Sequence, residues 1–447
     1  MAHLSKRKNL TEWLDYIEHL HSAEIEFGLT RVNQVFNALF PNGLDCRVIT
    51  VGGTNGKGST CTLIEKILLD AGYSCGKNTS PHIVNFNERV AINGNFASDD
   101  ELVDAFETID LKRQKILLTY FEFTFLAALV IFQKREVDFA ICEVGMGGRL
   151  DAVNILSPEA SIITNIGLDH TQWLGNTREA IALEKVAISR PHKPCIVGDA
   201  DFPTKSCDYL LEKKSKGLIY SKDFHIDSNE APSWQIIVSE FDEYFPDRDE
   251  SLLKNLPKLE AVHHYQNASC AILALLSMKN VKINSVGIKK ALTDSHIIGR
   301  CQILNQAPLI IVDVAHNIDS VKALCQFVRL KKSKIANQGK TIAIISMLDD
   351  KDMNASLQQI NEEIDEWYIA ELPVTRAANI EKIKSAIQFA QGNSKKGSIK
   401  NLKKSLIVKE FDSIKTAFTQ VKKSIKPSDC VVVFGSFFVV SDILHDS

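Results

Sequence analysis

The sequence has no long hydrophobic run. Its longest apolar stretches, such as Phe125–Phe132 and Val431–Phe434, are far shorter than the roughly 20 residues of a membrane-spanning helix. It also has no apolar segment near its start, because Met1–Leu10 is polar and basic, so a secretory signal is not expected. We therefore expect a cytoplasmic protein that does not associate with membranes.

Neither an excess of one charge nor paired cysteines is present. The chain has 52 Lys and Arg residues against 55 Asp and Glu, a formal net charge of −3, which gives no support to a nucleic-acid partner. The 10 cysteines occur singly and none forms a Cys-x-x-Cys pair, so neither a disulfide framework nor a cysteine metal site is expected. The hydrophobic share of 45% and the charged share of 24% are those of a globular protein.

The 447 residues are too many for one ordinary domain. Short apolar runs alternate with longer helical patterns, which is typical of a parallel sheet covered by helices. Two sets of strands are predicted: Arg47–Val51, Phe139–Cys142, Ser161–Thr164 and Cys195–Val197, and then Leu309–Val312, Thr341–Ile345, Glu366–Ala370 and Val431–Phe434. We predict an α/β fold with two three-layer domains, 1–296 and 297–447.

A glycine-rich stretch, Gly52–Ser59, joins the first predicted strand to a helical pattern. Glycines let backbone N–H groups approach an anion closely, and the start of the following helix favours negative charge. Lys57 adds a cation there. The spacing departs from GxxxxGK[ST], because Gly58 separates Lys57 from Ser59. The stretch predicts a nucleotide phosphate loop, and the alternative is a turn with a solvated lysine.

Polar side chains stand where other predicted strands end. Glu143 ends one strand, His170 follows another, and Asp313 and His316 follow a strand of the second set. Ligands of α/β sheets bind at the carboxyl ends of strands, and a carboxylate there suits the Mg²⁺ of a nucleotide. A helix-capping glutamate and a structural histidine are the alternatives.

Motifs in both predicted domains together resemble one family. They occur in the order Gly53-Thr54-Asn55-Gly56-Lys57, Thr79-Ser80-Pro81-His82, Asn87-Glu88-Arg89, Glu143–Asp151, Gly167-Leu168-Asp169-His170 and Asp313-Val314-Ala315-His316-Asn317. This set resembles the folylpolyglutamate synthase family of the Mur ligase superfamily, and within it the bacterial bifunctional dihydrofolate synthases. The resemblance runs from about residue 20 to the C-terminus. It implies an N-terminal P-loop ATPase domain of the Mur ligase type, with a pterin or folate site, and a C-terminal Rossmann-like glutamate-ligase domain.

The resemblance implies an ATP-dependent, ADP-forming amide ligase. Such an enzyme adds L-glutamate to dihydropteroate, and to the γ-carboxylate of folates, through an acyl phosphate. It would use ATP and two Mg²⁺ ions, act on small molecules and be a monomer. Another Mur-type ligase, acting on a peptidoglycan precursor, is the first alternative, although the phosphate loop begins near residue 52 and leaves no room for the extra N-terminal domain of those enzymes. A nucleotide-binding switch is the second, and it would not need Asp313 and His316.

The family pattern also implies roles for single residues. The catalytic residues would be Lys57, Lys185, His316 and Asp313, with Lys185 carbamylated and His316 placing glutamate. ATP would be bound by Thr54, Asn55, Gly56, Lys57, Asn267, Arg300 and Asp313. The metal ligands would be Ser80, Glu143 and His170. A salt-bridged structural lysine is the alternative for Lys185.

The pterin or folate site would be built by three segments. These are Glu24, Ile25, Glu26 and Phe27; then Thr119, Tyr120, Phe121 and Glu122; and then Leu150, Asp151 and Ala152. Phe121 and Phe123 would offer ring faces to the pterin, and the alternative is that both rings belong to the core.

Overall fold

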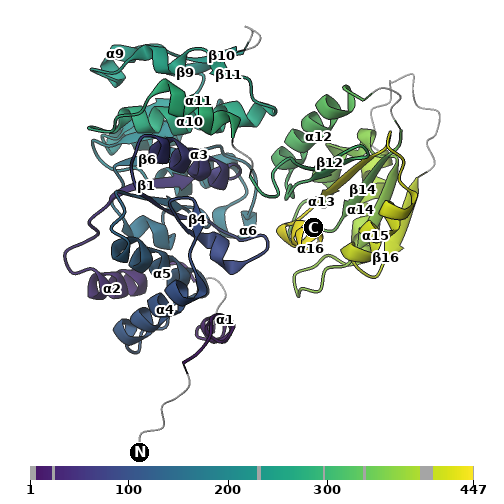
Figure 1. Ribbon diagram of the computed structural model, residues 1–447, viewed down its shortest axis with the longest axis horizontal. Coiled ribbons are helices and arrows are strands. Elements are labelled where there is room, and N and C mark those ends of the chain that lie inside the picture. The colour runs from purple at the N-terminus through teal and green to yellow at the C-terminus, as the bar shows by residue number, and fades with distance from the viewer. Residues whose placement is uncertain are drawn as a thin grey trace, which may run out of the picture. The chain divides into compact units, whose positions relative to one another are not determined.

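The computed structural model describes residues 7–22, 26–228, 233–294, 297–335, 339–392 and 406–445. The chain clusters into two compact units (Figure 1). The first unit comprises Met1–Gly167, Thr171–Leu259 and His264–Ser295, and the second comprises Leu168–His170, Glu260–His263 and His296–Ser447. Among the helices that the structure describes, none combines the length and the hydropathy needed to cross a bilayer.

An eight-stranded sheet forms the centre of the first unit, in the order β4-β3-β2-β5-β1-β6-β7-β8. Its strands are β1 (Arg47–Gly52), β2 (Cys75–Asn78), β3 (Val90–Ile92), β4 (Asn95–Phe96), β5 (Phe139–Glu143), β6 (Ala160–Ile163), β7 (Pro194–Val197) and β8 (Lys216–Ile219). The six neighbouring strands β2, β5, β1, β6, β7 and β8 are parallel to one another. At the edge beside β2, β3 pairs antiparallel with β2, and β4 pairs antiparallel with β3. The central strands read as continuous apolar runs because helices cover both faces of the sheet.

Two layers of helices enclose this sheet (Figure 1). One layer contains α1 (Leu10–Glu18), α2 (Thr30–Leu39), α4 (Asp99–Arg113), α5 (Tyr120–Lys134), α7 (Arg178–Val186) and α8 (Thr204–Glu212). The other contains α3 (Lys57–Asp70), α10 (Val262–Ser277) and α11 (Ser285–Thr293). A small sheet of β9 (Phe224–Asp227), β10 (Ser233–Val238) and β11 (Leu256–Pro257) adds to the hydrophobic core on the α3, α10 and α11 side of the large sheet. Short helical turns complete the unit: α6 (Thr171–Leu174), α9 (Phe241–Tyr244), η1 (Phe86–Arg89), η2 (Ala152–Ile155) and η3 (Glu250–Leu253).

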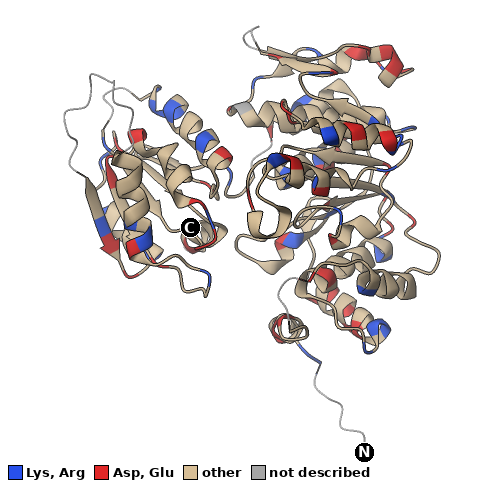
Figure 2. Cartoon of the chain, turned by 180° about the vertical axis from the view of Figure 1, so that it is seen from behind, with Lys and Arg blue, Asp and Glu red and all other residues tan. Residues whose placement is uncertain are grey.

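The second unit has a six-stranded sheet in the order β12-β13-β17-β14-β15-β16. Its strands are β12 (Gln302–Gln306), β13 (Leu309–Val312), β14 (Thr341–Ile345), β15 (Glu366–Ala370), β16 (Ile407–Phe411) and β17 (Cys430–Phe434), and only β12 pairs antiparallel. Its helices are α12 (Ile318–Lys332), α13 (Met353–Gln358), η4 (Asn361–Glu363), α14 (Ile380–Gly392), α15 (Ile414–Ser424) and α16 (Phe437–Leu444). Both basic and acidic residues lie on the helices of each unit (Figure 2). The basic end of α12, with Arg329, Lys331 and Lys332, suits the negative end of the helix dipole.

The prediction of two α/β halves is confirmed, and each predicted strand is present within one residue at either end. One helix prediction is wrong in extent. The helical pattern over Ser356–Ile364 predicts one continuous helix, but α13 ends at Gln358 and a 3₁₀ turn follows. The chain must leave the helical path there, because the Asp365 N–H already bonds to Thr341 O on β14 and the next residue begins β15. The small sheet β9–β11 was not predicted.

Candidate functional site

The predicted phosphate loop lies between β1, which ends at Gly52, and α3, which begins at Lys57. Gly53 has a φ of +139°, and a Cβ there would overlap Thr164 Oγ1, so only glycine fits. Gly56 is the N-cap of α3 with a φ of +83°. The loop therefore ends at the start of α3, where the positive end of the helix dipole favours an anion.

Two residues that follow β6 hold the loop in this shape. The Thr54 N–H donates to Asn165 O at 3.0 Å, and the Asn55 N–H donates to Asn165 Oδ1 at 2.8 Å. Thr164 Oγ1 donates to Asn55 O at 2.6 Å. Sequence reasoning did not assign these two residues to the site. The available signal was a Thr-Asn pair directly after a buried strand at the edge where ligands bind.

Lys57, Glu143 and Ser80 meet beside the loop. Lys57 Nζ lies 4.0 Å from Glu143 Oε1 and donates to Thr54 O at 3.3 Å. The other carboxylate oxygen, Glu143 Oε2, accepts from the Ser80 N–H at 3.1 Å. Three predicted site residues from β5, α3 and the segment after β2 are thus brought together by the fold.

This group offers oxygen ligands of the kind that Mg²⁺ prefers, namely a carboxylate and a hydroxyl. Within the described ranges, no three His, Cys, Asp or Glu side chains come together as a metal-binding group.

Lys185 and Asn267 lie behind the loop. The Lys185 side chain, on α7, is buried and its Nζ donates to Gly53 O at 3.0 Å. Asn267, on α10, packs so closely on Gly56 that a Cβ on Gly56 would lie 2.5 Å from Asn267 Oδ1. Asn267 Nδ2 is buried and has no hydrogen-bond partner among the residues that the structure describes. Buried donors are rarely left unpaired, so this amide is a candidate to contact a ligand.

The predicted pterin segments bring Phe121 and Asp151 together. The Phe121 ring packs directly on Gly145, and Asp151 Oδ2 lies beside the same glycine. Burial raises the pKa of Asp151 to about 6, although Asp151 accepts hydrogen bonds from the Met146 and Val153 N–H groups. Leu150 is half-buried and Ala152 is buried on either side of Asp151.

Phe123 is not part of this surface. It is fully buried in the core on the α4 side of the sheet, where its ring lies 5.8 Å from that of Phe106. The prediction that Phe123 offers a ring face to the pterin is therefore wrong, because the residue two positions after Phe121 points to the opposite side of α5.

Arg31 joins two of the predicted segments. Arg31 Nε donates to Glu122 Oε2 at 2.8 Å, and its Nη1 and Nη2 bond to Glu26. Glu122 also completes the capping box of α5 with Thr119. The Phe27 ring lies edge-on to Trp173 at 5.6 Å. The two other predicted residues of the first segment, Glu24 and Ile25, lie outside the described residues.

The second unit carries the other predicted group. Asp313, after β13, accepts from the Cys301 N–H at 2.6 Å and the Ala315 N–H at 2.7 Å, and burial raises its pKa. His316 Nδ1 lies 2.8 Å from Val314 O. The Arg300 guanidinium lies 4.9 Å from the centre of the Phe437 ring.

His316 also meets a segment that is distant in sequence. His316 Nε2 lies 3.4 Å from Asp169 Oδ2, in the segment Leu168–His170 of the second unit. His170, a predicted metal ligand, follows Asp169 and has a φ of +51°. Sequence reasoning gave Asp169 no role, although it directly precedes His170.

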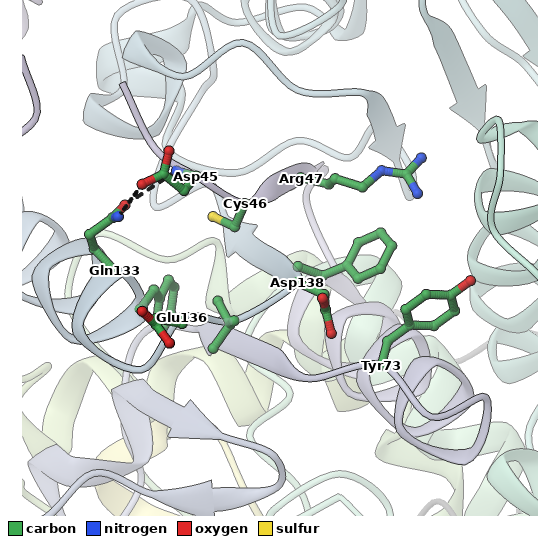
Figure 3. Close-up of a pocket in the computed structure, with 10 residues that line it drawn as sticks. Asp45, Cys46, Arg47, Tyr73, Gln133, Glu136 and Asp138 are labelled. Atoms are coloured by element: carbon green, nitrogen blue, oxygen red, sulfur yellow. Dashed lines mark hydrogen bonds between the residues drawn. The ribbon is translucent and has the colours of Figure 1, made fainter. Parts of the chain in front are cut away.

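A pocket of about 450 Å³ lies elsewhere in the first unit (Figure 3). Its lining includes Asp45, Cys46 and Arg47 at the start of β1, and Asp138 just before β5. Gln133 Nε2 donates to Asp45 Oδ2 at 2.6 Å. These residues lie at the amino ends of the strands, whereas the phosphate loop lies at their carboxyl ends, so this pocket is separate from the candidate site.

Comparisons with known proteins match the chain to two domain families. Residues 51–275 match the Mur ligase middle domain, and residues 299–437 match the Mur ligase glutamate ligase domain. A dihydrofolate synthase/folylpolyglutamate synthase of Escherichia coli is 36% identical over 436 residues, which cover 98% of this chain and 95% of that protein. The chain belongs to the dihydrofolate synthase/folylpolyglutamate synthase family of Mur ligases.

Solved structures of this family have the same fold. FolC of Escherichia coli in complex with DHPP and ADP has a TM-score of 0.86 at 33% identity, over 98% of this chain and 97% of that chain. The bifunctional Yersinia pestis enzyme complexed with AMPPNP and a Mn ion has a TM-score of 0.83 at 33% identity, over 98% of both chains. As a member of this family the chain is an ATP-binding ligase with dihydrofolate synthase/folylpolyglutamate synthase activity.

Proposed function

We propose that the first unit transfers the γ-phosphoryl group of ATP to the carboxylate of dihydropteroate or to the γ-carboxylate of a folate. The product is an acyl phosphate together with ADP. The amine of L-glutamate then attacks the acyl carbon, the C–O bond to phosphate breaks, and the amine loses a proton to give the amide. The observation that carries this proposal is the meeting of Lys57 with Glu143, and of Glu143 with the Ser80 N–H, beside a phosphate loop.

The loop residues Thr54, Asn55, Gly56 and Lys57 bind the phosphates in this proposal. Phosphoryl transfer needs the reactants held in line and the phosphate charge neutralised, and the N–H groups at the start of α3 and a lysine cation would provide both. Thr164 and Asn165 keep the loop in this conformation through its backbone. Asn267 contacts the nucleotide base, and its unpaired Nδ2 supports that role.

Two Mg²⁺ ions would be held by Ser80 and Glu143, and by Glu143 and His170. When bound, the ions neutralise charge on the phosphates. A carbamate on Lys185 would add a carboxylate close to Gly53, against which its amine lies now. Titrating Mg²⁺ against ADP formation in Glu143→Gln tests the ligand role, because the amide keeps the shape of the side chain and loses its charge. Full recovery at modest Mg²⁺ would contradict it.

The second unit would bind L-glutamate and contribute contacts to the nucleotide. His316 places glutamate, Arg300 contacts the phosphates and Asp313 faces the ribose. We assign ATP and pterin binding to residues 1–296 and glutamate ligation to residues 297–447. The pterin itself would lie among Glu26, Phe27, Thr119, Tyr120, Phe121, Glu122, Leu150, Asp151 and Ala152.

We also propose that the enzyme acts as a monomer in the cytoplasm. The 10 cysteines are all free, which suits a reducing compartment.

The test is ADP production with dihydropteroate or tetrahydrofolate as acceptor, each with and without L-glutamate. We expect sustained ADP release only when acceptor and glutamate are both present. Turnover with a peptidoglycan precursor, or ADP release without any acceptor, would contradict the proposed function.

A further inference from the structure

Arg89 lies at the end of η1, in the motif Asn87-Glu88-Arg89, and has no assigned role. Its guanidinium lies between two aromatic rings, 5.6 Å from the centre of Phe86 and 5.5 Å from that of Tyr120. Both contacts are cation–π contacts, which support a guanidinium that has lost part of its water. Burial lowers the pKa of Arg89, against the opposing effects of Tyr120 and Glu143.

In the described part of the chain, this cation forms no hydrogen bond or ion pair with a carboxylate. Arg89 Nε donates to His82 Nδ1 at 2.9 Å, which is a neutral acceptor. Within the described ranges, its two Nη nitrogens form no hydrogen bond or ion pair. The adjacent Glu88 carboxylate does not pair with Arg89. It accepts hydrogen bonds from the N–H groups of residues 83, 84 and 85 instead.

Other arginines of the same unit that are buried or half-buried do pair with carboxylates. Arg31 pairs with Glu26 and Glu122, and Arg113 pairs with Asp110 and donates to Ile116 O. An incompletely paired cation in a partly buried position costs free energy, so a site of this kind is stabilised by an anion. A guanidinium with two free Nη groups matches a planar carboxylate, which it binds through two parallel hydrogen bonds.

The backbone places Arg89 next to the candidate site. Arg89 O accepts from the Thr79 N–H at 3.0 Å and from Asn78 Nδ2 at 3.0 Å. Ser80, which follows Thr79, donates its N–H to Glu143 Oε2. The second ring against the guanidinium, Tyr120, belongs to a predicted pterin segment. Arg89 therefore stands between the predicted pterin surface and the group that would hold the phosphates.

We propose that Arg89 binds the carboxylate of the acceptor substrate, the group to which the amide bond is made. His82 orients the guanidinium through Nε, and Phe86 and Tyr120 fix its plane, so that both Nη groups face the incoming carboxylate. This inference rests on the proposed function, since it names the residue that recognises the acceptor's reacting end.

The test compares two ligands that differ only in this carboxylate. Dissociation constants are measured by calorimetry, with ADP and Mg²⁺ present, for pteroate and for its analogue with an unsubstituted phenyl ring in place of the benzoate. For Arg89→Gln we expect pteroate to bind about 10- to 100-fold more weakly, the range of a lost charge-assisted hydrogen bond. The analogue should bind the variant and the wild type equally.

Arg47→Gln is the matched control. Arg47, at the start of β1, also lies over an aromatic ring, with its guanidinium carbon 5.0 Å from the centre of the Phe139 ring. Unlike Arg89, it forms an ion pair, with Glu159. This variant should bind both ligands as the wild type does.

Three results would overturn the inference. Unchanged pteroate affinity in Arg89→Gln would show that the carboxylate is bound elsewhere, and equal weakening of both ligands would show a structural role. A rise confined to the KM for glutamate would assign the anion to the second substrate. If Arg89→Gln does not fold, Arg89→Lys replaces it, and it should weaken pteroate binding selectively because an ammonium cannot form the paired bonds. ADP production by the wild type, with acceptor and glutamate present, tests the proposed function separately. If the wild type forms ADP, any of the three results above counts against the role of Arg89 alone.

Discussion

Lys351 Nζ lies 2.6 Å from Asp169 Oδ1, and both side chains are almost fully buried, with 7% and 9% of their surface exposed. Asn317 Nδ2 donates to the other oxygen of Asp169 at 3.0 Å, and His316 Nε2 lies 3.4 Å from it. Burial opposes ionisation of Asp169, but His316 and Lys351 together hold its pKa well below its usual range. A single carboxylate thus anchors the segment before His170 and contacts the histidine expected to place glutamate.

We expect Asp169→Asn to destabilise the second unit by about 1–3 kcal/mol, because the buried Lys351 ammonium loses its nearer counter-charge and keeps only Asp350, whose Oδ2 lies 3.7 Å away. The KM for glutamate should rise more than the KM for ATP, since His316 loses the group that its Nε2 faces. Urea unfolding and steady-state kinetics measure the two effects.

The control for this change is Asp349→Asn. Asp349 pairs with Lys382 at 2.8 Å, but the side chains are 60% and 45% exposed. Removal of such a pair costs about 0–1 kcal/mol. Equal losses in both variants would contradict the anchoring role of Asp169.

Replacement of Lys57 by Ala should lower kcat/KM by at least about 100-fold, because a preorganised cation beside the phosphates is removed. The fold should persist, since Lys57 makes one hydrogen bond to Thr54 O and one long ion pair with Glu143. ADP release and the thermal midpoint measure the two outcomes. Lys205→Ala, at an exposed lysine paired with Glu179, is the control. A correctly folded Lys57→Ala enzyme with near-normal turnover would rule out the phosphate-loop assignment.

Two variants distinguish a carbamylated Lys185 from a structural one. If Lys185 carries a carbamate, Lys185→Ala should lose most activity and recover part of it with acetate or formate. Lys185→Arg should be inactive, because a guanidinium keeps the positive charge and forms no carbamate. Activity is measured at saturating ATP, Mg²⁺ and glutamate.

A structural lysine gives the opposite pattern. The amine donates to Gly53 O at 3.0 Å, and a guanidinium can make the same bond. Wild-type turnover in Lys185→Arg, with no response to added acids, would therefore assign Lys185 to holding the loop.

His82 should make stability depend on pH in the acidic range. Burial and the Arg89 charge lower the pKa of His82 from 6.5 to about 4. Between these two pKa values the unfolded chain binds more protons than the folded protein. The contribution of His82 to the free energy of unfolding is therefore complete above pH 6.5 and is lost as the pH falls toward 4. We expect a loss of about 1 kcal/mol, because the ring is only partly buried.

His82→Gln measures this contribution, because its amide oxygen can accept from Arg89 Nε and does not titrate. The difference in unfolding free energy between wild type and variant should shrink, or change sign, between pH 7 and pH 4.5. A difference that stays constant over this range would contradict the assignment to His82.

Much of the fold could be predicted from local patterns. Strands such as Leu309–Val312 and Glu366–Ala370 are continuous apolar runs that end at polar residues, and their bounds agree with β13 and β15. The strand β9 (Phe224–Asp227) has no such run, since only Phe224 is buried, and it exists because it pairs with β10.

Residues that sit in a motif, such as Lys57 and Glu143, could be proposed for the candidate site from the sequence. Contacts made by tertiary structure had no local signal. Arg31 bridges Glu26 and Glu122 from α2, and Lys351 reaches Asp169 across 182 positions of sequence. Phe123 was placed wrongly because the motif gives the segment and not the side of the helix that each ring faces.

The path of the chain between its two units limits how the protein can be recombined. Gly167, whose N–H donates to Thr54 Oγ1 at 2.9 Å, belongs to the first unit, while Leu168–His170 and Glu260–His263 belong to the second. A chimera that exchanged only the C-terminal 151 residues, 297–447, would keep its own Asp169 while importing a foreign partner for it. Asp169 and Lys351 must therefore be inherited together, and a productive crossover between relatives would have to exchange these short segments along with the C-terminal half.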